Sequence, residues 1–331
     1  MGRSCAKVIY YNMIENKLND FKNKKIAIIG DIILDKYILG KVERISPEAP
    51  IPVVSVLKEK YVPGGAANVA ANISTLGGQA FLFGLVGNDY SGELLLNRLS
   101  NFSVNTDGII KDSQRKTTEK IRVIGHNQQL LRIDYEDTSY IPQNTEVLIV
   151  DKIKAQNFDI IIISDYAKGT ITSDILKEIK LIAKKDNIKI IIDPKPSHKN
   201  WYHDSFLITP NQKEAGEMLG ENIVTENDFI EAGIELVNIY NSNIVITAGS
   251  QGMYVFEKDK KHKHIHTKAK EVYDVSGAGD TVVATLALGL SANMSLLDSA
   301  ELANLAAGIK VGKLGTAPVK IEELKNAIKM A

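Results

Sequence analysis

The chain has 331 residues, 44% of them hydrophobic, which favours a globular fold with a large core and excludes a mainly disordered protein. Lysine and arginine number 40, as do aspartate and glutamate, so no net basic charge favours nucleic-acid binding. The single cysteine, Cys5, excludes an intramolecular disulfide and a zinc site built from thiolates.

The N-terminal residues do not predict export or membrane insertion. Residues 1–20 carry charges at Lys7, Glu15, Lys17 and Asp20 and have no uninterrupted apolar core, unlike a signal peptide. The isoleucine-rich runs further along are too short to cross a bilayer. The sequence therefore predicts a cytoplasmic protein with no membrane partner, in which residues 1–23 form an N-terminal extension.

Short β-branched runs alternate with longer amphipathic stretches through most of the chain. Buried strands are predicted at residues 25–30, 80–84, 158–164, 188–193, 206–209 and 243–247. Helices are predicted at residues 66–76, 91–99, 173–184 and 226–240. This alternation predicts an α/β fold with a mainly parallel sheet and helices on both faces. In such sheets, ligands bind beyond the carboxyl ends of the strands.

Two segments depart from this alternation. Residues 36–60 contain three prolines followed by an alternating strand pattern, and residues 116–134 have the pattern of paired strands with a turn near Gly125. We expect both to form a small β-flap, inserted into a single domain of residues 24–331, that acts as a lid over a site.

The clearest candidate for catalysis is Gly277-Ala278-Gly279-Asp280, directly before the apolar helical stretch 281–290. Small residues at a helix start leave backbone N–H groups accessible, and the helix dipole makes this an anion site. A carboxylate there suits a base that takes a proton from an attacking hydroxyl while the amides stabilise a transferred phosphoryl group. A simple chain turn with an acidic first helical turn explains the same residues, so this motif alone leaves both interpretations open.

A second turn of small residues, Pro63 to Asn68, opens another predicted helix. The glycines Gly64 and Gly65 let the backbone approach a polyhydroxylated ligand, and Asn68 can donate and accept hydrogen bonds. A tight turn with a helix cap is also compatible with these residues. The sequence contains no Walker-type loop and no G-x-G-x-x-G after the first strand, which disfavours those nucleotide-binding motifs.

In this order, the two motifs resemble the signatures of the ribokinase or PfkB family of carbohydrate kinases. The matched residues are Gly64 to Asn68, Ala70, Gly77 and Gly87 in the first signature, Asp274, Gly277, Gly279 and Asp280 in the second, Asn211-Gln212-Lys213-Glu214 in an N-x-x-E element, and Asp35 after the first strand. The resemblance implies a ribokinase-like three-layer sandwich and an ATP-dependent sugar kinase that uses Mg²⁺.

The resemblance also implies roles for individual residues. Asp280 would be the catalytic base beside the amides of Gly277, Ala278 and Gly279, and the sugar would bind Asp35, Gly64, Gly65 and Asn68. Nucleotide contacts are implied for Asn211, Gln212, Lys213, Glu214, Thr247, Gly249, Gly252 and Asn304, with Glu214 organising Mg²⁺ through water. Asp274, Ser276 and Gly315 resemble a monovalent-cation site that would take K⁺.

Further blocks resemble family members that act on D-glycero-β-D-manno-heptose 7-phosphate. These blocks are residues 30–35, 44–50, 127–132, 164–169 and 311–316. They imply transfer of phosphate from ATP to the anomeric oxygen, giving the 1,7-bisphosphate for ADP-heptose and lipopolysaccharide core synthesis. Candidate substrate contacts in the flap or at strand ends are Arg132, Lys168, Asp193 and Lys195, whose cations could hold the substrate's phosphate. Solvated surface charges explain the same lysines, and an ion pair with Asp134 or Glu136 explains Arg132.

Two alternatives stay open. One is a kinase of the same family for ribose, fructose or a hexose phosphate, and the other is a non-catalytic regulator that binds a sugar or a nucleotide. The presence of Asp280 and Glu214 favours catalysis, because a regulator needs neither.

The remaining features concern assembly and metals. The chain ends at Ala331 without an H-x-G-H signature, so a stand-alone kinase without a nucleotidyltransferase is expected. By resemblance we expect a homodimer, in which a partner covers the strand edges of the flap. His262, His264 and His266 alternate as zinc ligands on a strand could, but the interleaved lysines favour an exposed strand.

Overall fold

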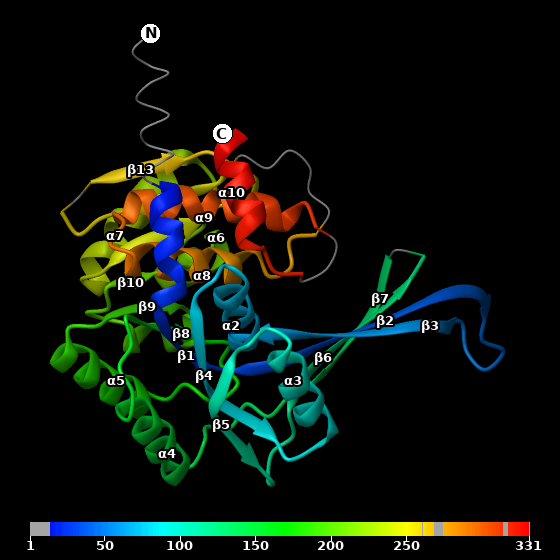
Figure 1. The fold of residues 1–331 in the computed structure, drawn as a ribbon. Coiled ribbons are helices and arrows are strands. Elements are labelled where there is room, and N and C mark those ends of the chain that lie inside the picture. Colours follow the sequence, from blue (N-terminus) through cyan, green and yellow to red (C-terminus); the bar gives the residue numbers. More distant parts are fainter. Residues whose placement is uncertain (1–13, 127, 260, 268–273, 314–316, 331) are drawn as a thin grey trace.

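The protein is represented by a computed structural model that describes residues 14–126, 128–259, 261–267, 274–313 and 317–330 (Figure 1). A nine-stranded sheet forms its centre, in the order β13-β12-β11-β10-β9-β8-β1-β4-β5. Its strands are β1 (Lys25–Gly30), β4 (Gln79–Gly87), β5 (Asn105–Asp112), β8 (Ile160–Ser164), β9 (Lys189–Asp193), β10 (Leu207–Ile208), β11 (Asn243–Thr247), β12 (Met253–Phe256) and β13 (His262–Ile265). The pairings from β5 to β11 are parallel, and β12 and β13 add an antiparallel edge.

Alternate residues of the central strands face two separate cores. In β1, Ile26 and Ile28 belong to one core and Ala27 and Ile29 to the other, because successive side chains of a strand point to opposite faces. The first core is covered by α2 (Ala66–Thr75), α3 (Tyr90–Ser100), α8 (Ala278–Ser291), α9 (Leu296–Val311) and α10 (Ile321–Met330). The second is covered by α4 (Gln143–Lys154), α5 (Ser173–Asp186), α6 (Gln212–Leu219) and α7 (Glu226–Tyr240). The ribokinase-like three-layer fold is therefore confirmed.

Local sequence signals set the ends of several helices. Helix α5 begins after Thr172, whose hydroxyl accepts a hydrogen bond from the Ile175 N–H, and ends at Asn187 in the left-handed conformation. A capping box of Thr225 and Asp228 starts α7. The structure also has three short 3₁₀ helices, η1 (Phe21–Asn23), η2 (Pro196–Trp201) and η3 (Gly249–Gln251).

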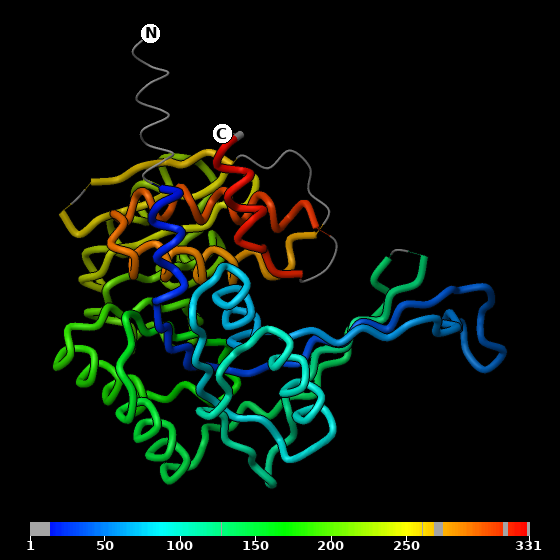
Figure 2. The backbone as a smooth tube through the Cα atoms, viewed as in Figure 1, coloured from blue at the N-terminus to red at the C-terminus, as the bar shows by residue number. Residues whose placement is uncertain are grey.

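A four-stranded sheet projects from the main body as a long arm (Figures 1 and 2). It has the order β3-β2-β6-β7, with β2 (Ile32–Ile45), β3 (Pro52–Gly65), β6 (Thr118–Gly125) and β7 (Gln128–Tyr135). The prediction that residues 116–134 form paired strands is confirmed, and β6 also pairs in parallel with β2. Both irregular segments of the sequence thus meet in this arm, which we call the lid sheet.

The N-terminal residues that the structure describes pack against the main domain. Residues 14–20 are helical, and Ile14, Leu18 and Phe21 are buried in the first core. Cys5 lies outside the described residues. Within the described part of the chain, no helix is both long and apolar enough to cross a membrane.

Candidate active site

The predicted site residues converge at the carboxyl ends of the parallel strands. Two neighbouring cavities of about 230 and 330 Å³ lie there, and both are lined by Thr247, Gly279 and Val282. The first also contacts Asp280, and the second extends toward α9. This is the edge of an α/β sheet at which ligands bind.

Asp280 lies in the first turn of α8, where its carboxylate is almost fully buried. The Asn68 amide donates a hydrogen bond to one carboxylate oxygen at 2.5 Å, and the Tyr166 hydroxyl donates to the other at 2.9 Å. Gly277 precedes the helix with φ +74°, and a Cβ there would lie 2.6 Å from the Asn68 nitrogen. Glycine is therefore required both for the backbone conformation and for the approach of Asn68.

The surroundings of Asp280 tune its acidity. Burial raises the pKa of this carboxyl to about 6, while the hydrogen bonds from Asn68 and Tyr166 oppose the rise and the charge of Asp35 adds to it. A carboxyl with a pKa just below neutrality is ionised at physiological pH and still accepts a proton readily. That is the property required of a general base.

The predicted amides around Asp280 do not all face the same space. Gly277 and Gly279 line the first cavity, and Ala278 and Gly279 line the second. The N–H of Ala278 donates to the carbonyl of Val275 at 3.2 Å, so this amide stabilises the turn itself.

The residues predicted to bind a sugar surround Asp280 on the lid side. Asp35 lies on β2, and its carboxylate accepts a hydrogen bond from the Arg122 guanidinium of β6 at 2.5 Å. Burial raises the pKa of Asp35, and Arg122 opposes this rise. A Cβ on Gly64 would meet Asp35 Oδ2 at 2.5 Å, and Gly65 has φ +55°. The turn before α2 therefore needs glycines so that it can pack against Asp35.

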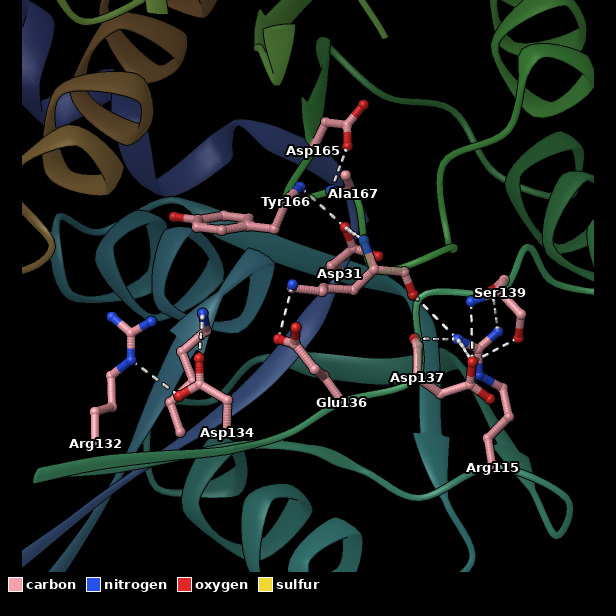
Figure 3. Close-up of polar contacts among 12 residues, drawn as sticks. Asp31, Arg115, Arg132, Asp134, Glu136, Asp137, Ser139, Asp165, Tyr166 and Ala167 are labelled. Carbon is pink, nitrogen blue, oxygen red and sulfur yellow. Dashed lines mark hydrogen bonds and ion pairs between the residues drawn. The ribbon is translucent and has the colours of Figure 1, made fainter. Parts of the chain in front are cut away.

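A loop at the end of β8 brings Tyr166 to Asp280. The buried carboxylate of Asp31 accepts hydrogen bonds from the backbone N–H groups of Tyr166 and Lys168, at 2.9 and 3.0 Å (Figure 3). It also accepts one from the N–H of Thr170, at 3.0 Å. Ala167, between them, has φ +53°, which is unusual for a residue with a side chain. Asp31 thus fixes the shape of this loop and the position of the Tyr166 ring.

Two of the three cations predicted to bind the substrate, Lys168 and Arg132, are already paired with carboxylates. Lys168 forms a 2.7 Å ion pair with Glu136, and Arg132 on β7 donates to Asp134 at 3.0 Å (Figure 3). Lys120 of β6 lies 3.9 Å from the same Asp134. Lys168 is largely covered, whereas the Arg132 side chain is 53% exposed. The structure thus gives Arg132 the ion pair that the sequence left open.

The first cavity also contains a group of acidic and polar side chains. It is lined by Asp193, Lys195, Asn211 and Glu214. Asn211 and Glu214 form the capping box of α6, with hydrogen bonds of 2.9 and 3.0 Å. Asp193 and Lys195 therefore lie close to Glu214 in the same cavity.

The two carboxylates of this group suit a divalent cation. Burial raises the pKa of Asp193 well above its ordinary value and the charge of Glu214 raises it further, while Lys195 opposes the rise. The described residues contain no cluster of three or more metal-ligating side chains. Mg²⁺ commonly takes one or two carboxylates together with waters and phosphates, so a pair of carboxylates beside open space fits this ion.

The second cavity is mainly apolar and includes four of the predicted nucleotide contacts: Thr247, Gly249, Gly252 and Asn304. The Asn304 amide donates to the His266 carbonyl at 2.8 Å. Two other predicted contacts, Gln212 and Lys213, line an adjoining open hollow that shares Thr247 and Gly249 with this cavity. Gln212 donates to the Ile223 carbonyl at 2.6 Å, and Lys213 is exposed beside Glu217.

The predicted monovalent-cation residues are only partly described. Asp274 accepts a hydrogen bond from the Ser276 N–H at 2.8 Å, and its own N–H donates to the Val311 carbonyl at 3.2 Å. Gly315 lies outside the described residues.

The histidines of β13 pack against aromatic rings. His264 stacks on Tyr254 with ring centroids 4.0 Å apart and bonds to the Gln251 carbonyl at 2.8 Å. His262 stacks on Phe256. These contacts agree with the expectation that the stretch forms a strand.

Three residues of the site were not singled out from the sequence: Tyr166, Arg122 and the buried Lys310 of α9. Tyr166 follows a strand end, which is a usable signal. Arg122 lies within an alternating lid strand and Lys310 in an apolar helix, so their surroundings depend on tertiary packing.

Residues 23–323 match the description "pfkB family carbohydrate kinase". The chain belongs to this family. It is therefore a sugar kinase, an enzyme that transfers a phosphoryl group to an alcohol.

Curated relatives are similar over most of the chain. It is 39% identical over 318 residues to the bifunctional protein HldE of Syntrophotalea carbinolica, covering 95% of this chain and 65% of that protein. It is 41% identical over 304 residues to the bifunctional protein HldE of Geobacter sulfurreducens, covering 91% and 62%. The chain thus spans less than two thirds of the length of these relatives.

Solved structures share the fold at low sequence identity. Phosphofructokinase-2 from Escherichia coli, in complex with substrates and products, has a TM-score of 0.78 at 19% identity, covering 93% of this chain and 99% of that one. Ribokinase from Arabidopsis thaliana, complexed with ribose and ATP, has a TM-score of 0.76 at 18% identity, covering 93% and 99%.

Proposed function

We propose that this kinase phosphorylates D-glycero-β-D-manno-heptose 7-phosphate at the anomeric oxygen, using ATP and Mg²⁺. The product would be the 1,7-bisphosphate, a precursor for ADP-heptose and lipopolysaccharide core synthesis. The observation that carries the kinase mechanism is the buried Asp280, which shares a cavity with Asp193 and Glu214 and whose pKa is raised further by the charge of Asp35. The choice of heptose rests on the five sequence blocks and agrees with relatives about 40% identical that are named bifunctional protein HldE.

In this proposal Asp280 accepts the proton of the anomeric hydroxyl. The anomeric oxygen attacks the γ-phosphorus of ATP as the bond from that phosphorus to the ADP oxygen breaks, and ADP leaves. Tyr166 and Asn68 hold the carboxylate in position through their hydrogen bonds. Asp35, Gly64 and Gly65 would orient the sugar hydroxyls.

The phosphate side of the site would use different residues. Bound Mg²⁺ supplies positive charge to the phosphate oxygens of the nucleotide, and Asp193 and Glu214 would hold it directly or through water. Lys195 lines the same cavity and would contact a phosphoryl oxygen. The N-terminus of α8, with the small residues Gly277 and Gly279, adds the partial positive charge of a helix start.

The 7-phosphate of the sugar would bind among three cations: Lys120 and Arg132 of the lid sheet and Lys168 of the loop after β8. Lys168 and Lys120 are close enough to repel each other, and burial together with this repulsion lowers the pKa of Lys120. A dianionic phosphate would relieve that repulsion. Lys168 is the first of these residues to test, because it lies in the same loop as Tyr166, which contacts Asp280.

A coupled ADP-release assay tests the substrate. We expect turnover with the heptose 7-phosphate. With ribose, fructose 6-phosphate or the heptose that lacks the phosphate, kcat/KM should be at least about 100-fold lower, because about two charge-assisted contacts to the phosphate would be lost. Lys168→Met should raise the KM for the 7-phosphate without changing it for the unphosphorylated heptose. Lys177→Met, at an exposed position on α5 beside Asp174, is the matched control. Equal rates with and without the 7-phosphate would rule out this substrate.

We also propose a homodimer that forms through the lid sheet. Large apolar side chains remain exposed there, including Val56 at 55%, Leu57 at 67% and Leu131 at 54%. Several exposed large apolar side chains on one element are a feature of interfaces between proteins.

A further inference from the structure

Lys310 is the only lysine or arginine buried in the part of the chain that the structure describes. It lies in the last turn of α9, and none of its surface is exposed. Burying an ammonium group is costly unless a negative charge lies close by. We therefore expect an acidic group close to the Lys310 ammonium group.

The side chain of Lys310 lies beneath the turn that carries the catalytic motif. Its Cε is 3.7 Å from the position that a Cβ would take on Gly277, the residue that begins α8. Asp274 is the acidic group that interacts with it most strongly, and Asp280 interacts more weakly. The hydrogen bond from the Asp274 N–H to the Val311 carbonyl ties the end of α9 to this turn.

The same turn and the same Asp274 are where the family resemblance implied a monovalent cation. A protonated lysine carries the same single charge as K⁺. Two cations at one carboxylate would repel each other, and two further lysines, Lys313 and Lys60, add positive charge near Lys310. The described residues around Asp274 are therefore better suited to an internal ammonium group than to an added ion.

We propose that Lys310 replaces the monovalent cation in this enzyme and acts as a positioning residue. Its ammonium group neutralises Asp274 and supports the turn from Gly277 to Asp280 from below. The enzyme would then bind nucleotide and transfer phosphate equally well with and without K⁺. The inference rests on the nucleotide-binding half of the proposed function and is independent of which sugar is phosphorylated.

Calorimetry with Mg²⁺ and the non-hydrolysable ATP analogue AMP-PNP tests this, in KCl and in choline chloride of equal ionic strength. We expect the affinity of the wild-type protein to differ by less than about threefold between the two salts. Lys310→Met should bind at least about tenfold more weakly in choline chloride and recover most of that loss in KCl or NH₄Cl. A stronger response of the wild type to K⁺ would contradict the proposal, as would a folded Lys310→Met protein that no monovalent cation restores.

Two controls separate the proposed role from simple loss of structure. Lys313→Met removes a neighbouring cation that is paired with Glu323, and it should not create a response to K⁺. Lys310→Met/Asp274→Asn removes both charges, so it should fold without K⁺ and show no response to it. The unfolding temperature without nucleotide or sugar gives the same comparison: K⁺ should raise it for Lys310→Met but not for the wild type. This measurement stays decisive even if the proposed sugar or nucleotide is wrong.

Discussion

The Asp280 carboxylate accepts hydrogen bonds from two side chains and is almost completely shielded from solvent. Asn68 and Tyr166 together do not compensate for its burial, so its pKa rises to about 6. Burying Asp280 therefore lowers the stability of the folded protein at neutral pH, and it also raises the basicity of the carboxylate. Active sites often combine such a loss of stability with a gain in reactivity.

The first prediction concerns pH. Because only the ionised carboxylate accepts a proton, kcat/KM should fall about tenfold for each pH unit below about 6 and level off above it. Measuring kcat/KM between pH 5 and 8 at saturating Mg²⁺ checks this. A rate that stays constant down to pH 5 would show that another group is the base.

The second prediction concerns stability. The folded-state pKa of Asp280 lies above the ordinary value of 3.8, so folding favours the protonated form. The resulting cost is absent below pH 3.8, grows as pH rises, and reaches about 3 kcal/mol above pH 6, since each pKa unit corresponds to about 1.36 kcal/mol.

Asp280→Asn removes this cost but places its amide nitrogen against the Asn68 donor. We therefore expect the variant to be about 1–3 kcal/mol more stable than the wild type at pH 7.5 and no more stable at pH 4. Urea unfolding at the two pH values provides the measurement. A variant that is less stable at pH 7.5 would contradict the assigned pKa.

At the scale of elements, three backbone N–H groups in the loop of residues 165–170 donate to the buried carboxylate of Asp31, and one donates to Asp165. Asp31→Ala would leave the N–H groups of Tyr166, Lys168 and Thr170 without their acceptor, at a cost of at least about 3 kcal/mol in the free energy of unfolding. Activity should fall as well, because Tyr166 would no longer be held at Asp280.

Asp137→Ala is a suitable comparison for Asp31→Ala. Asp137 accepts hydrogen bonds from both Ser139 groups in an exposed turn, so its loss should cost less than about 1 kcal/mol. If the two variants unfolded at the same urea concentration, Asp31 would not have the structural role described above.

The lid sheet is the element with the most exposed apolar surface, and Leu57 is its most exposed large apolar residue. If a second copy covers this face, Leu57→Asp should convert the dimer to a monomer in sedimentation velocity experiments. Leu181→Asp, at a residue of α5 that is 62% exposed, should leave the assembly unchanged. A monomeric wild-type protein would exclude the proposed interface.

At the scale of the whole molecule, sequence patterns predicted the features that depend only on residues close together in the chain. The isoleucine-rich strands, the helix that starts at Ala66 and the small residues before α8 were all evident in the sequence, because each follows from periodicity or capping. The pairing of Tyr166 with Asp280 was not, since these residues are 114 positions apart and meet only when β8 and α8 pack together.

Charges were the hardest feature to place. The sequence suggested Asp193 and Lys195 as sugar contacts, and the structure places both in the cavity that contains Asp280 and Glu214. No local pattern marks Lys310 as buried, and only the packing of α9 under the Gly277 turn reveals it. Strand ends and helix periodicity do not determine which cation faces which carboxylate.

The central claim is that Asp280 is the base for phosphoryl transfer, and single-turnover kinetics with Asp280→Asn test it most directly. Formation of the sugar bisphosphate should be measured beside calorimetry of heptose 7-phosphate binding. The account predicts a rate at least about 1,000-fold lower than that of the wild type, as expected for loss of a positioned base, with sugar affinity changed by less than about threefold. An Asp280→Asn protein that transfers phosphate at close to the wild-type rate would contradict the account.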